Sequence, residues 1–281
     1  MKRIVTIQDI SCMGRCSLTV ALPIISAMGV ETCVIPTTVL SNHTANCFSG
    51  FTFHDLTGEI PAITAQWKKE GITFDAIYTG YLGSFDQIDL VTKFFEDFGQ
   101  NGKTLRIVDP AMADHGVLYA GFTPDFAKKM GTLCGKADVI LPNLTEASLM
   151  LDLPYVGSDY DEAYIKNLLK ELTTLGCPTA ILTGVSFQPD KVGAMAYNAV
   201  TDTYAAYFNE KYPVQFHGTG DIFASTCVGA LSGGLDLSAA LKVAVDFTLE
   251  CIRQTDKDPN SRPYGVSFEA AIPFLIHSLG K

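Results

Sequence analysis

The 281-residue sequence lacks several features that define common classes of protein. It has 20 Lys and Arg against 30 Asp and Glu, a formal net charge of −10, and no run of basic residues. Duplex nucleic acid is bound by basic side chains that neutralise phosphates, so the composition argues against a nucleic-acid-binding protein. Any anionic ligand must therefore be held by a local feature of the chain.

Long apolar segments are also missing. Only a short apolar run follows Met1, Lys2 and Arg3, and it is far shorter than the apolar region of a signal peptide. No stretch approaches the roughly 18 consecutive apolar residues that indicate a membrane-spanning helix. The sequence therefore predicts a cytoplasmic protein, and its 47% hydrophobic and 18% charged residues predict a globular one.

The eight cysteines are scattered, and none forms a CxxC pair. In a chain of this length without an export signal, this pattern predicts buried, reduced thiols. Cys12 and Cys16 have the character of half a metal site, but no second pair follows at the spacing that zinc sites use. We therefore expect reduced cysteines that bind no zinc.

Three motifs of nucleotide and acyl chemistry are absent. The sequence contains no GxxxxGK[ST], which excludes a P-loop, and no GxGxxG after the first predicted strand, which argues against a Rossmann cofactor. The GxSxG elbow of the α/β-hydrolases is missing as well. Any chemistry on phosphate groups must therefore use another arrangement.

Strand and helix patterns alternate along most of the chain. Strands are predicted at residues 3–7, 32–35, 76–78, 105–108, 139–141, 180–182, 193–197 and 204–208. Helices are predicted at residues 17–28, 61–70, 87–98, 124–134, 145–151, 162–175, 222–231, 237–252 and 268–279. This alternation predicts a single domain over residues 1–281 with a doubly wound, mostly parallel sheet and helices on both faces. A hairpin around Asp202 and a small β element at residues 48–54 are expected at its edges.

Polar residues gather just after the predicted strands, where sheets of this class bind their ligands. These positions are Gln8-Asp9, Thr79-Gly80-Tyr81, Asp109-Pro110, Pro142-Asn143 with Glu146 close behind, and Thr183-Gly184. Asp109 and Glu146 could converge on one metal ion. Asp-Pro and Asn-x-x-Glu are also typical of turns and helix caps, so both interpretations stay open.

The segment HGTGD at residues 217–221 comes just before an apolar helix. Gly218 and Gly220 allow the backbone to direct several N–H groups toward one point at the positive end of that helix, which predicts an anion site. Asp221 then has two possible roles. It caps the helix, or it takes a proton from a hydroxyl group while the anion site stabilises charge on a phosphoryl group.

Five segments occur in the order VLSNHT, TGYLGS, VDPAMAD, PNLTE and HGTGD. Together they resemble the ribokinase-like superfamily and, within it, the pyridoxal (vitamin B6) kinases, over essentially the whole chain. The resemblance implies ATP-dependent phosphorylation of the 5'-hydroxymethyl group of pyridoxal, pyridoxine or pyridoxamine. It also implies Mg²⁺, a monovalent cation such as K⁺, and a homodimer.

The resemblance further implies roles for particular residues of this sequence. The implied catalytic residues are Asp221 as the base and the amides of Gly218, Thr219 and Gly220 as the anion site. The implied Mg²⁺ residues are Asp109 and Glu146, and the implied nucleotide contacts are Asn143, Thr183, Thr219 and Gly220. The implied substrate site comprises Asp9, Ser11, His43, Thr44, Tyr81, Asp114 and Tyr119, the last two on a flap at residues 111–119.

One position departs from this pattern. Pyridoxal kinases often have Gln-Ser-His after the first strand, whereas this chain has Gln8-Asp9-Ile10-Ser11. An Asp there can accept a hydrogen bond from a protonated ring nitrogen or a ring hydroxyl, and it is similar to the hydroxymethylpyrimidine kinases. A hydroxymethylpyrimidine kinase or a dual-substrate kinase is therefore the alternative enzyme. The alternative from another class is a non-catalytic protein that binds a B6 vitamer or a nucleotide.

Overall fold

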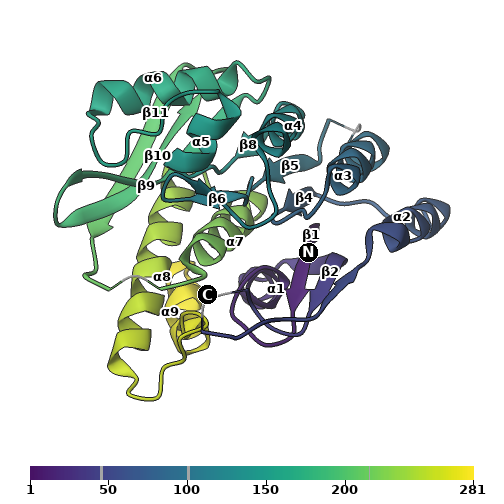
Figure 1. Cartoon of the computed structure of the whole chain (residues 1–281), viewed down its shortest axis with the longest axis horizontal. Helices are drawn as coiled ribbons and strands as arrows, with labels where there is room; N and C mark the ends of the chain where they lie inside the picture. The colour runs from purple at the N-terminus through teal and green to yellow at the C-terminus, as the bar shows by residue number, and fades with distance from the viewer. Residues whose placement is uncertain (45–46, 100–101, 215) are drawn as a thin grey trace. The chain divides into compact units, whose positions relative to one another are not determined.

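The computed structural model describes residues 1–44, 47–99, 102–214 and 216–281. The chain forms two compact units, one of Met1–Ala76 with Tyr212–Lys281 and one of Ile77–Lys211 (Figure 1). The first unit therefore contains both ends of the chain, and the second is a continuous segment. Among the described residues, no helix combines the length and the apolar character needed to cross a membrane.

The first unit begins with the βαβ arrangement that the sequence predicts. Strand β1 (Arg3–Ser11) pairs in parallel with β2 (Glu31–Leu40), and helix α1 (Leu18–Ala27) connects them. The short strand β3 (Phe53–Asp55) pairs antiparallel with the end of β2. Since β3 stands last in the order of strands, it is the small edge element that was expected.

Strand β1 is longer than predicted. Its pairing with β2 shifts register between Gln8, opposite Pro36, and Ile10, opposite Val39. Gln8 and Asp9 were expected just after the strand, but both lie within it, and Asp9 occupies the irregular step. Polar residues at the end of an apolar pattern made the strand look shorter, although both side chains are buried. Such irregular steps redirect side chains and are common next to functional sites.

The other helices of the first unit come mostly from the C-terminal part of the chain. They are η1 (Thr57–Glu59), α2 (Ile60–Lys69), α7 (Thr219–Ser232), α8 (Leu237–Lys257) and α9 (Phe268–Ser278). Helix α7 packs against both α1 and α8, and α8 packs against α9. Nearly all of α7 beyond its first turn is buried, which is typical of a helix that is apolar on every side.

The strands of the second unit follow the order β11, β10, β9, β8, β5 and β4. Their bounds are β4 (Ala76–Thr79), β5 (Leu105–Val108), β8 (Val139–Ile140), β9 (Thr179–Gln188), β10 (Lys191–Asn198) and β11 (Thr203–Glu210). Strands β5, β8 and β9 pair in parallel, whereas β9, β10 and β11 pair antiparallel. The hairpin predicted around Asp202 is therefore present.

Strand β9 also extends beyond its predicted end. It was expected to stop at residue 182, but it continues to Gln188 because its second half pairs with β10. Thr183 therefore lies within the strand and not after it. Its backbone N–H donates to the carbonyl of Pro142 at 3.0 Å, which ties β9 to the segment that follows β8.

The helices of the second unit lie between its strands along the sequence. They are α3 (Phe85–Phe98), α4 (Pro124–Cys134), α5 (Leu144–Met150) and α6 (Glu162–Thr173). Helix α4 packs against α3 and α5, and α6 packs against β9 and β10. A separate small hairpin, β6 (Ala113–Asp114) with β7 (Val117–Leu118), forms within the predicted flap.

Candidate active site

The start of α7 combines a left-handed glycine with a close approach of main chains. Gly218 is the N-cap residue and has φ 82° and ψ 2°, a conformation that residues with a Cβ rarely adopt. A Cβ at this position would lie 2.3 Å from the carbonyl oxygen of Arg15, whereas a Cβ at Gly220 would meet nothing within 4 Å. The first N–H groups of a helix have no acceptor inside it and lie at its positive end. The segment therefore has the geometry of an anion site.

Asp221 lies in the first turn of α7 and is half-buried. The N-cap residue of α7 makes no side-chain hydrogen bond, and the Asp221 carboxylate accepts one from the backbone N–H of Ser17, just before α1. Burial raises the pKa of Asp221 from 3.8 to about 7; the Ser17 N–H opposes this shift and the negative charge of Asp9 adds to it. A carboxylate with a pKa near neutrality is suited to accept a proton from a hydroxyl group.

Asp9 and Ser11 bring the end of β1 into the same cluster. Asp9 is only 5% exposed, and burial raises its pKa. The hydroxyl groups of Ser17 and Ser11 hydrogen-bond to the Asp9 carboxylate and oppose that shift, the latter at 3.4 Å. Ser17 thus contacts both carboxylates, Asp9 through its side chain and Asp221 through its N–H.

The cysteine between these residues is held neutral. Burial raises the pKa of the Cys16 thiol far above its usual 9.0, and the charges of Asp221 and Asp9 raise it further. All eight cysteines are free, as predicted, but only five are buried, since Cys33 is half-buried and Cys12 and Cys47 are exposed.

Two histidines meet in the first unit. The rings of His43 and His217 lie edge to face, with their centroids 5.7 Å apart. Burial lowers the pKa of His43, and the neighbouring His217 lowers it further. The Nδ1 atom of His43 is buried and has no hydrogen-bond partner among the described residues. Thr44, the next residue, is exposed. A neutral imidazole with a free nitrogen next to HGTGD is able to bind a ligand.

The start of α5 in the second unit is a reciprocal capping box. The Asn143 side chain accepts a hydrogen bond from the Glu146 N–H at 2.9 Å, and Glu146 Oε2 accepts one from the Asn143 N–H at 2.8 Å. Glu146 Oε1 accepts a third from the Met112 N–H at 3.1 Å. Burial raises the pKa of Glu146 from 4.5 to about 8, and these backbone N–H groups oppose the shift. The Asn-x-x-Glu segment is therefore a helix cap, whatever else its side chains do.

The β6–β7 hairpin is anchored on this cap. The Asn143 Nδ2 donates to the main chain of β6 at 2.8 Å, and the Gly116 N–H donates to Thr145 Oγ1 at 2.9 Å. Asp114 and Tyr119, the two flap residues predicted near the substrate, are both exposed. The flap therefore has a fixed base on α5 and polar and aromatic side chains open to solvent.

Asp109 follows β5 directly and is buried. Its backbone N–H donates to the carbonyl of Thr79 at 2.8 Å, which joins the ends of β5 and β4. Asp109 and Glu146 both raise the pKa of the buried Cys134 thiol, after the larger effects of burial and Cys177. The two predicted metal carboxylates therefore lie in the same part of the second unit.

Tyr81 and Thr183 occupy other positions in the second unit. The Tyr81 ring lies 5.5 Å from the ring of Phe122, centroid to centroid, and Phe122 stacks on Phe126 of α4. The Thr183 hydroxyl donates to the carbonyl of Pro142 at 3.4 Å, beside the α5 cap. Tyr81 therefore belongs to an aromatic cluster, and Thr183 lies next to Asn143.

The carboxylates of the second unit offer few free oxygens to a metal ion. Among the described residues, no group of three or more His, Cys, Asp or Glu side chains is arranged to hold a metal ion. Both oxygens of Glu146 already accept backbone N–H groups. These residues therefore do not fit a resident metal held by the protein alone. They suit an ion that arrives with the oxygens of a bound ligand.

The predicted site residues thus fall into two sets. The first unit holds Asp9, Ser11, His43, Thr44, Gly218, Thr219, Gly220 and Asp221. The second unit holds Tyr81, Asp109, Asp114, Tyr119, Asn143, Glu146 and Thr183. Within the first set Ser17 links Asp9 to Asp221, and within the second the α5 cap links Asn143, Glu146 and the flap.

Sequence reasoning missed Ser17 and Arg15. Their contacts with Asp221 and Gly218 use main-chain atoms, the N–H of Ser17 and the carbonyl of Arg15. A pattern of side-chain types cannot reveal such contacts. Their only signal was their place between the first strand and the first helix, where ligand sites of this class occur.

The fold and the site together are those of a phosphotransferase of the α/β class. Comparison with known proteins identifies the family. Residues 21–263 match the phosphomethylpyrimidine kinase family, which is far more than half of the 281 residues. The chain belongs to this family.

Solved structures and sequence relatives agree with that assignment. A protein from Bacteroides thetaiotaomicron, assigned as a phosphomethylpyrimidine kinase and crystallised with pyridoxal, is 42% identical, with a TM-score of 0.91 over 98% of this chain and 95% of that one. The pyridoxal kinase of Lactobacillus plantarum is 28% identical, with a TM-score of 0.88 over 99% and 97%. The pyridoxine/pyridoxal/pyridoxamine kinase of Bordetella avium is 25% identical over 263 residues, 90% of this chain and 86% of that protein.

These comparisons confirm several predictions from the sequence. The mostly parallel, doubly wound α/β fold is that of the pyridoxal kinases. The resemblance to the vitamin B6 kinases within the wider superfamily is confirmed as well. The chain is an enzyme, a kinase, and as a member of a kinase family it uses ATP.

Proposed function

We propose that this kinase transfers the γ-phosphoryl group of ATP to the hydroxymethyl oxygen of pyridoxal, pyridoxine or pyridoxamine. The observation that carries the proposal is the start of α7, where a half-buried Asp221 with a pKa of about 7 follows the left-handed Gly218. A base and an anion site side by side are what transfer to a hydroxyl group requires. The 42% identical Bacteroides protein, crystallised with pyridoxal, supports the choice of substrate.

The chain mainly positions the hydroxymethyl group and the γ-phosphoryl group and stabilises the charge between them. Asp221 accepts the proton of the hydroxymethyl group as its oxygen attacks the γ-phosphorus in line. The amides of Gly218, Thr219 and Gly220 face the negative charge of the phosphoryl group at the positive end of α7. The net charge of −10 does not oppose this locally, because charges beyond a Debye length of about 8 Å are screened at physiological salt.

The pyridine ring is assigned to the residues that the resemblance implies, which come from both units. His43, with its free Nδ1, and the buried Asp9 present an imidazole and a carboxylate to polar groups on the ring. Ser11 at the end of β1 and Thr44, four residues after the end of β2, supply hydroxyl groups. From the second unit, Tyr81 supplies an aromatic face, and the flap supplies Asp114 and Tyr119. This assignment extends the roles that the resemblance implies.

Mg²⁺ is proposed to enter with ATP, because the side chains alone do not make a metal site. Asp109 would hold a water or the ion itself, and Glu146 would fix the cap beside it. Asn143 and Thr183 would then contact the nucleotide phosphates. Bound Mg²⁺ supplies charge neutralisation on the phosphate oxygens. A monovalent cation such as K⁺ is part of the same proposal. Asp109→Asn should therefore raise the Mg²⁺ concentration needed for half-maximal rate, and an unchanged titration curve would remove Asp109 from this role.

A hydroxymethylpyrimidine kinase is the second candidate. The specific observation that favours it is Asp9, which is buried beside Asp221 and could receive a hydrogen bond from a ring substituent. The family to which the chain belongs is also named for phosphomethylpyrimidine. Both substrates present a hydroxymethyl group on an aromatic ring, so the reaction is the same and only the ring differs.

A substrate panel separates these possibilities. We expect ADP release in the presence of the three B6 vitamers, with kcat/KM for the best of them at least about tenfold above that for hydroxymethylpyrimidine. The reverse ranking would assign the chain to the pyrimidine substrate. Binding of a vitamer without ADP release, for wild-type protein with ATP and Mg²⁺, would favour the non-catalytic alternative.

The remaining expectations concern the whole chain. We propose that residues 1–281 act as one kinase domain and that two chains form a homodimer in the cytoplasm, as the resemblance implies. Light scattering after size-exclusion chromatography measures the mass in solution. A mass near the 30.3 kDa of one chain at working concentrations would contradict the dimer.

A further inference from the structure

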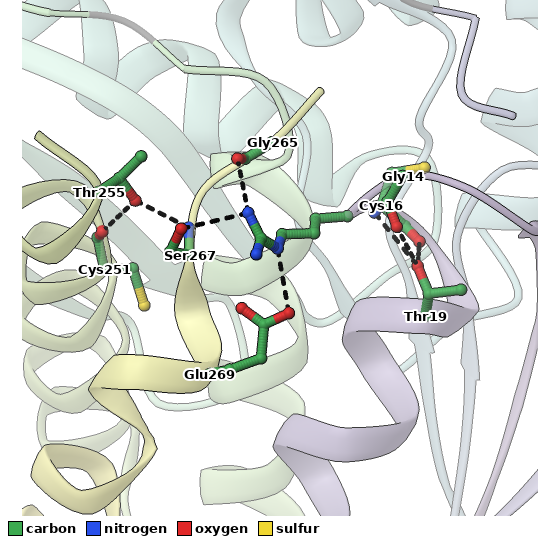
Figure 2. A network of polar contacts seen from close by, with 9 residues as sticks. Gly14, Cys16, Thr19, Cys251, Thr255, Gly265, Ser267 and Glu269 are labelled. Atoms are coloured by element: carbon green, nitrogen blue, oxygen red, sulfur yellow. Dashed lines mark hydrogen bonds and ion pairs between the residues drawn. The ribbon is translucent and has the colours of Figure 1, made fainter. Parts of the chain in front are cut away.

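Arg15 makes several contacts with the first turn of α9 and the segment just before it. Its Nε lies 3.0 Å from Glu269 Oε1, and its Nη1 donates to Ser267 Oγ at 3.1 Å and to the Gly265 carbonyl at 3.4 Å (Figure 2). Its backbone N–H donates to the Tyr264 carbonyl at 3.3 Å. A side chain with three partners on one segment is well fixed, because the planar guanidinium presents its donors in a set geometry.

The partner segment is itself held in the core. The Ser267 N–H donates to the Thr255 hydroxyl at 2.7 Å, and that hydroxyl donates to the Cys251 carbonyl at 2.7 Å, so the segment is tied to α8 (Figure 2). Ser267, Thr255 and Cys251 are all buried. Through Ser267, Arg15 is therefore tied to the buried part of the first unit, while its ion pair with Glu269 lies at the surface.

The main chain of Arg15 touches the start of α7 directly. The Arg15 carbonyl approaches so closely that a Cβ on Gly218 would lie 2.3 Å from it. On its other side, a Cβ on Gly265 would lie 2.6 Å from Arg15 Cβ. The backbone at Arg15 is therefore enclosed between the anion-site glycine and the segment before α9.

The residues after Arg15 lead straight to Asp221. The single hydroxyl proton of Thr19 lies between two carbonyl oxygens, that of Cys16 at 2.8 Å from Oγ1 and that of Gly14 at 3.1 Å, which closes the segment onto α1 (Figure 2). Ser17 has φ 49°, a conformation that is strained for a residue with a side chain and persists only where its surroundings enforce it. In that conformation its N–H donates to the Asp221 carboxylate.

We propose that Arg15 is a positioning residue for phosphoryl transfer: by fixing residues 14–17 to the start of α9, it holds the Ser17 N–H on Asp221 and the Arg15 carbonyl against Gly218. The inference rests on the proposed function, since it assigns Asp221 as the base. Arg15 does not touch the reacting atoms. It acts through its own backbone, whose carbonyl lies against Gly218, so an arginine outside the HGTGD segment can position that segment.

The proposed role of Arg15 can be tested through the pKa of Asp221. The groups that shift its pKa are its own burial, the Ser17 N–H and the charge of Asp9 from β1, and the neutral Cys16 thiol lies beside both carboxylates. The Ser17 N–H lowers the pKa, so its displacement must raise it. A residue with a purely structural role would lower stability without moving this pKa.

The experiment compares Arg15→Gln and Arg15→Lys with Arg3→Gln as a matched control. Arg3 also pairs with a carboxylate, Glu31 at 3.0 Å, but at the start of β1. For Arg15→Gln we expect kcat to fall about 10- to 100-fold, the scale of a slightly misplaced catalytic group, with KM for the vitamer changed less than about threefold. The acidic limb of the kcat profile should move to higher pH. Arg15→Lys, which can still pair with Glu269, should recover part of the rate, and Arg3→Gln should behave as wild type.

A milder variant keeps the proposal testable if Arg15→Gln does not fold. A second measurement, which needs no turnover, keeps it testable if the protein is inactive. Glu269→Gln leaves the bonds of Arg15 to Ser267 and Gly265 and should lower kcat only a few-fold, with the same direction of pH shift. The pKa of Asp221 can be followed by carboxyl ¹³C NMR, with Asp221→Asn to assign the signal. It should be higher in Arg15→Gln than in wild type.

Two results would overturn the inference. One is a folded Arg15→Gln protein with wild-type kcat, and the other is a loss of thermal stability with an unmoved Asp221 pKa. If wild-type protein phosphorylates no vitamer, the proposed function fails, but the NMR comparison still decides the role of Arg15.

Discussion

The starts of α5 and α7 each carry one acidic residue in the first turn, but the two acids have different partners. One bonds to its own helix and the other to a different segment of the chain. Each helix carries an acid in its first turn, Glu146 in α5 and Asp221 in α7. Glu146 bonds back to the N-cap of its own helix. Asp221 accepts instead from Ser17, on another segment, and the N-cap of α7 is a glycine with no side chain to offer. The first helix start is closed by its own residues, and the second is left open for an external anion.

The pKa values alone would not have separated the two sites. Burial raises the pKa of Glu146 to about 8 and that of Asp221 to about 7. Perturbed carboxylates occur both in structural networks and in active sites. The difference lies in the partners, because both Glu146 oxygens are already occupied by backbone N–H groups. We therefore assign stability to the α5 start and proton transfer to the α7 start.

Asp221→Asn should have the largest effect on this comparison. The amide oxygen can still accept from the Ser17 N–H, so the protein should fold and bind ATP, but it cannot take a proton. General-base assistance is worth about 10²–10⁴ in rate, so kcat should fall by that factor. Steady-state phosphorylation of pyridoxal measures the rate, and calorimetry measures ATP binding. Turnover near the wild-type value would show that Asp221 is not the base and leave it only a structural role beside Ser17.

Gly218→Ala should be the next most damaging change. A left-handed conformation costs a residue with a Cβ about 1–3 kcal/mol, and here the methyl group would also press against the Arg15 carbonyl at 2.3 Å. We expect a lower midpoint of urea unfolding together with a lower kcat. Gly220→Ala is the matched control, because its methyl group would meet no atom within 4 Å, and it should cost less on both measures. Equal losses in the two variants would show that the contact with Arg15 does not matter.

The dependence on pH should distinguish the two acids. Folding raises the pKa of Asp221 from 3.8 to about 7 and that of Glu146 from 4.5 to about 8. The folded state therefore binds extra protons in that range, so each acid contributes stability below its unfolded pKa that is lost as pH rises through its folded pKa. Activity should rise through about pH 7, because Asp221 must be ionised to act as base.

Variants assign each part of that pH dependence. Asp221→Asn should flatten the stability curve up to about pH 7, and Glu146→Gln should flatten the part that extends to about pH 8. Glu146→Gln should leave the acidic limb of the rate profile in place. Thermal melts without nucleotide or Mg²⁺, beside rate profiles with both, make the comparison. A rate profile that moves with Glu146→Gln and not with Asp221→Asn would exchange the two assignments.

Much of the fold was accessible from the sequence because its elements are long and periodic. The βαβ opening, the hairpin at Asp202 and the edge strand were all placed within a few residues. The largest errors fall at β1, β2 and β9, which run on to Ser11, Leu40 and Gln188. Polar residues such as Gln8, Asp9 and Thr183 interrupt the apolar pattern there, while the strand pairing, which depends on distant segments, continues.

The sequence predicted only those parts of the candidate site that depend on side-chain type. HGTGD and Asn-x-x-Glu could be recognised as helix starts, but sequence could not say that Glu146 would cap its own helix and Asp221 would not. That difference depends on Ser17, whose N–H reaches Asp221 only in the folded chain. The contact between Arg15 and Gly218 is likewise a main-chain approach over more than 200 residues of sequence, and no local pattern encodes it.

Asn143→Ala should have the smallest effect and tests the α5 side of the comparison. Removing an N-cap side chain costs about 0.5–2 kcal/mol, and here the bond from Nδ2 to the main chain of β6 is lost too, so the upper part of that range applies. The flap loses one anchor, and KM for ATP should rise modestly. Asp161→Ala is the matched control in the same unit, because Asp161 caps α6 by accepting from the Tyr164 N–H at 2.8 Å.

The two caps should destabilise the protein by similar amounts in urea unfolding, and only Asn143→Ala should change KM for ATP. If kcat instead fell by more than about 100-fold at unchanged stability, the α5 start would be catalytic. If neither KM nor kcat moved, Asn143 would be a cap and nothing more. In that case the two helix starts would differ even more sharply, since all the chemistry would then depend on the open end of α7, where Asp221 leaves its own helix uncapped.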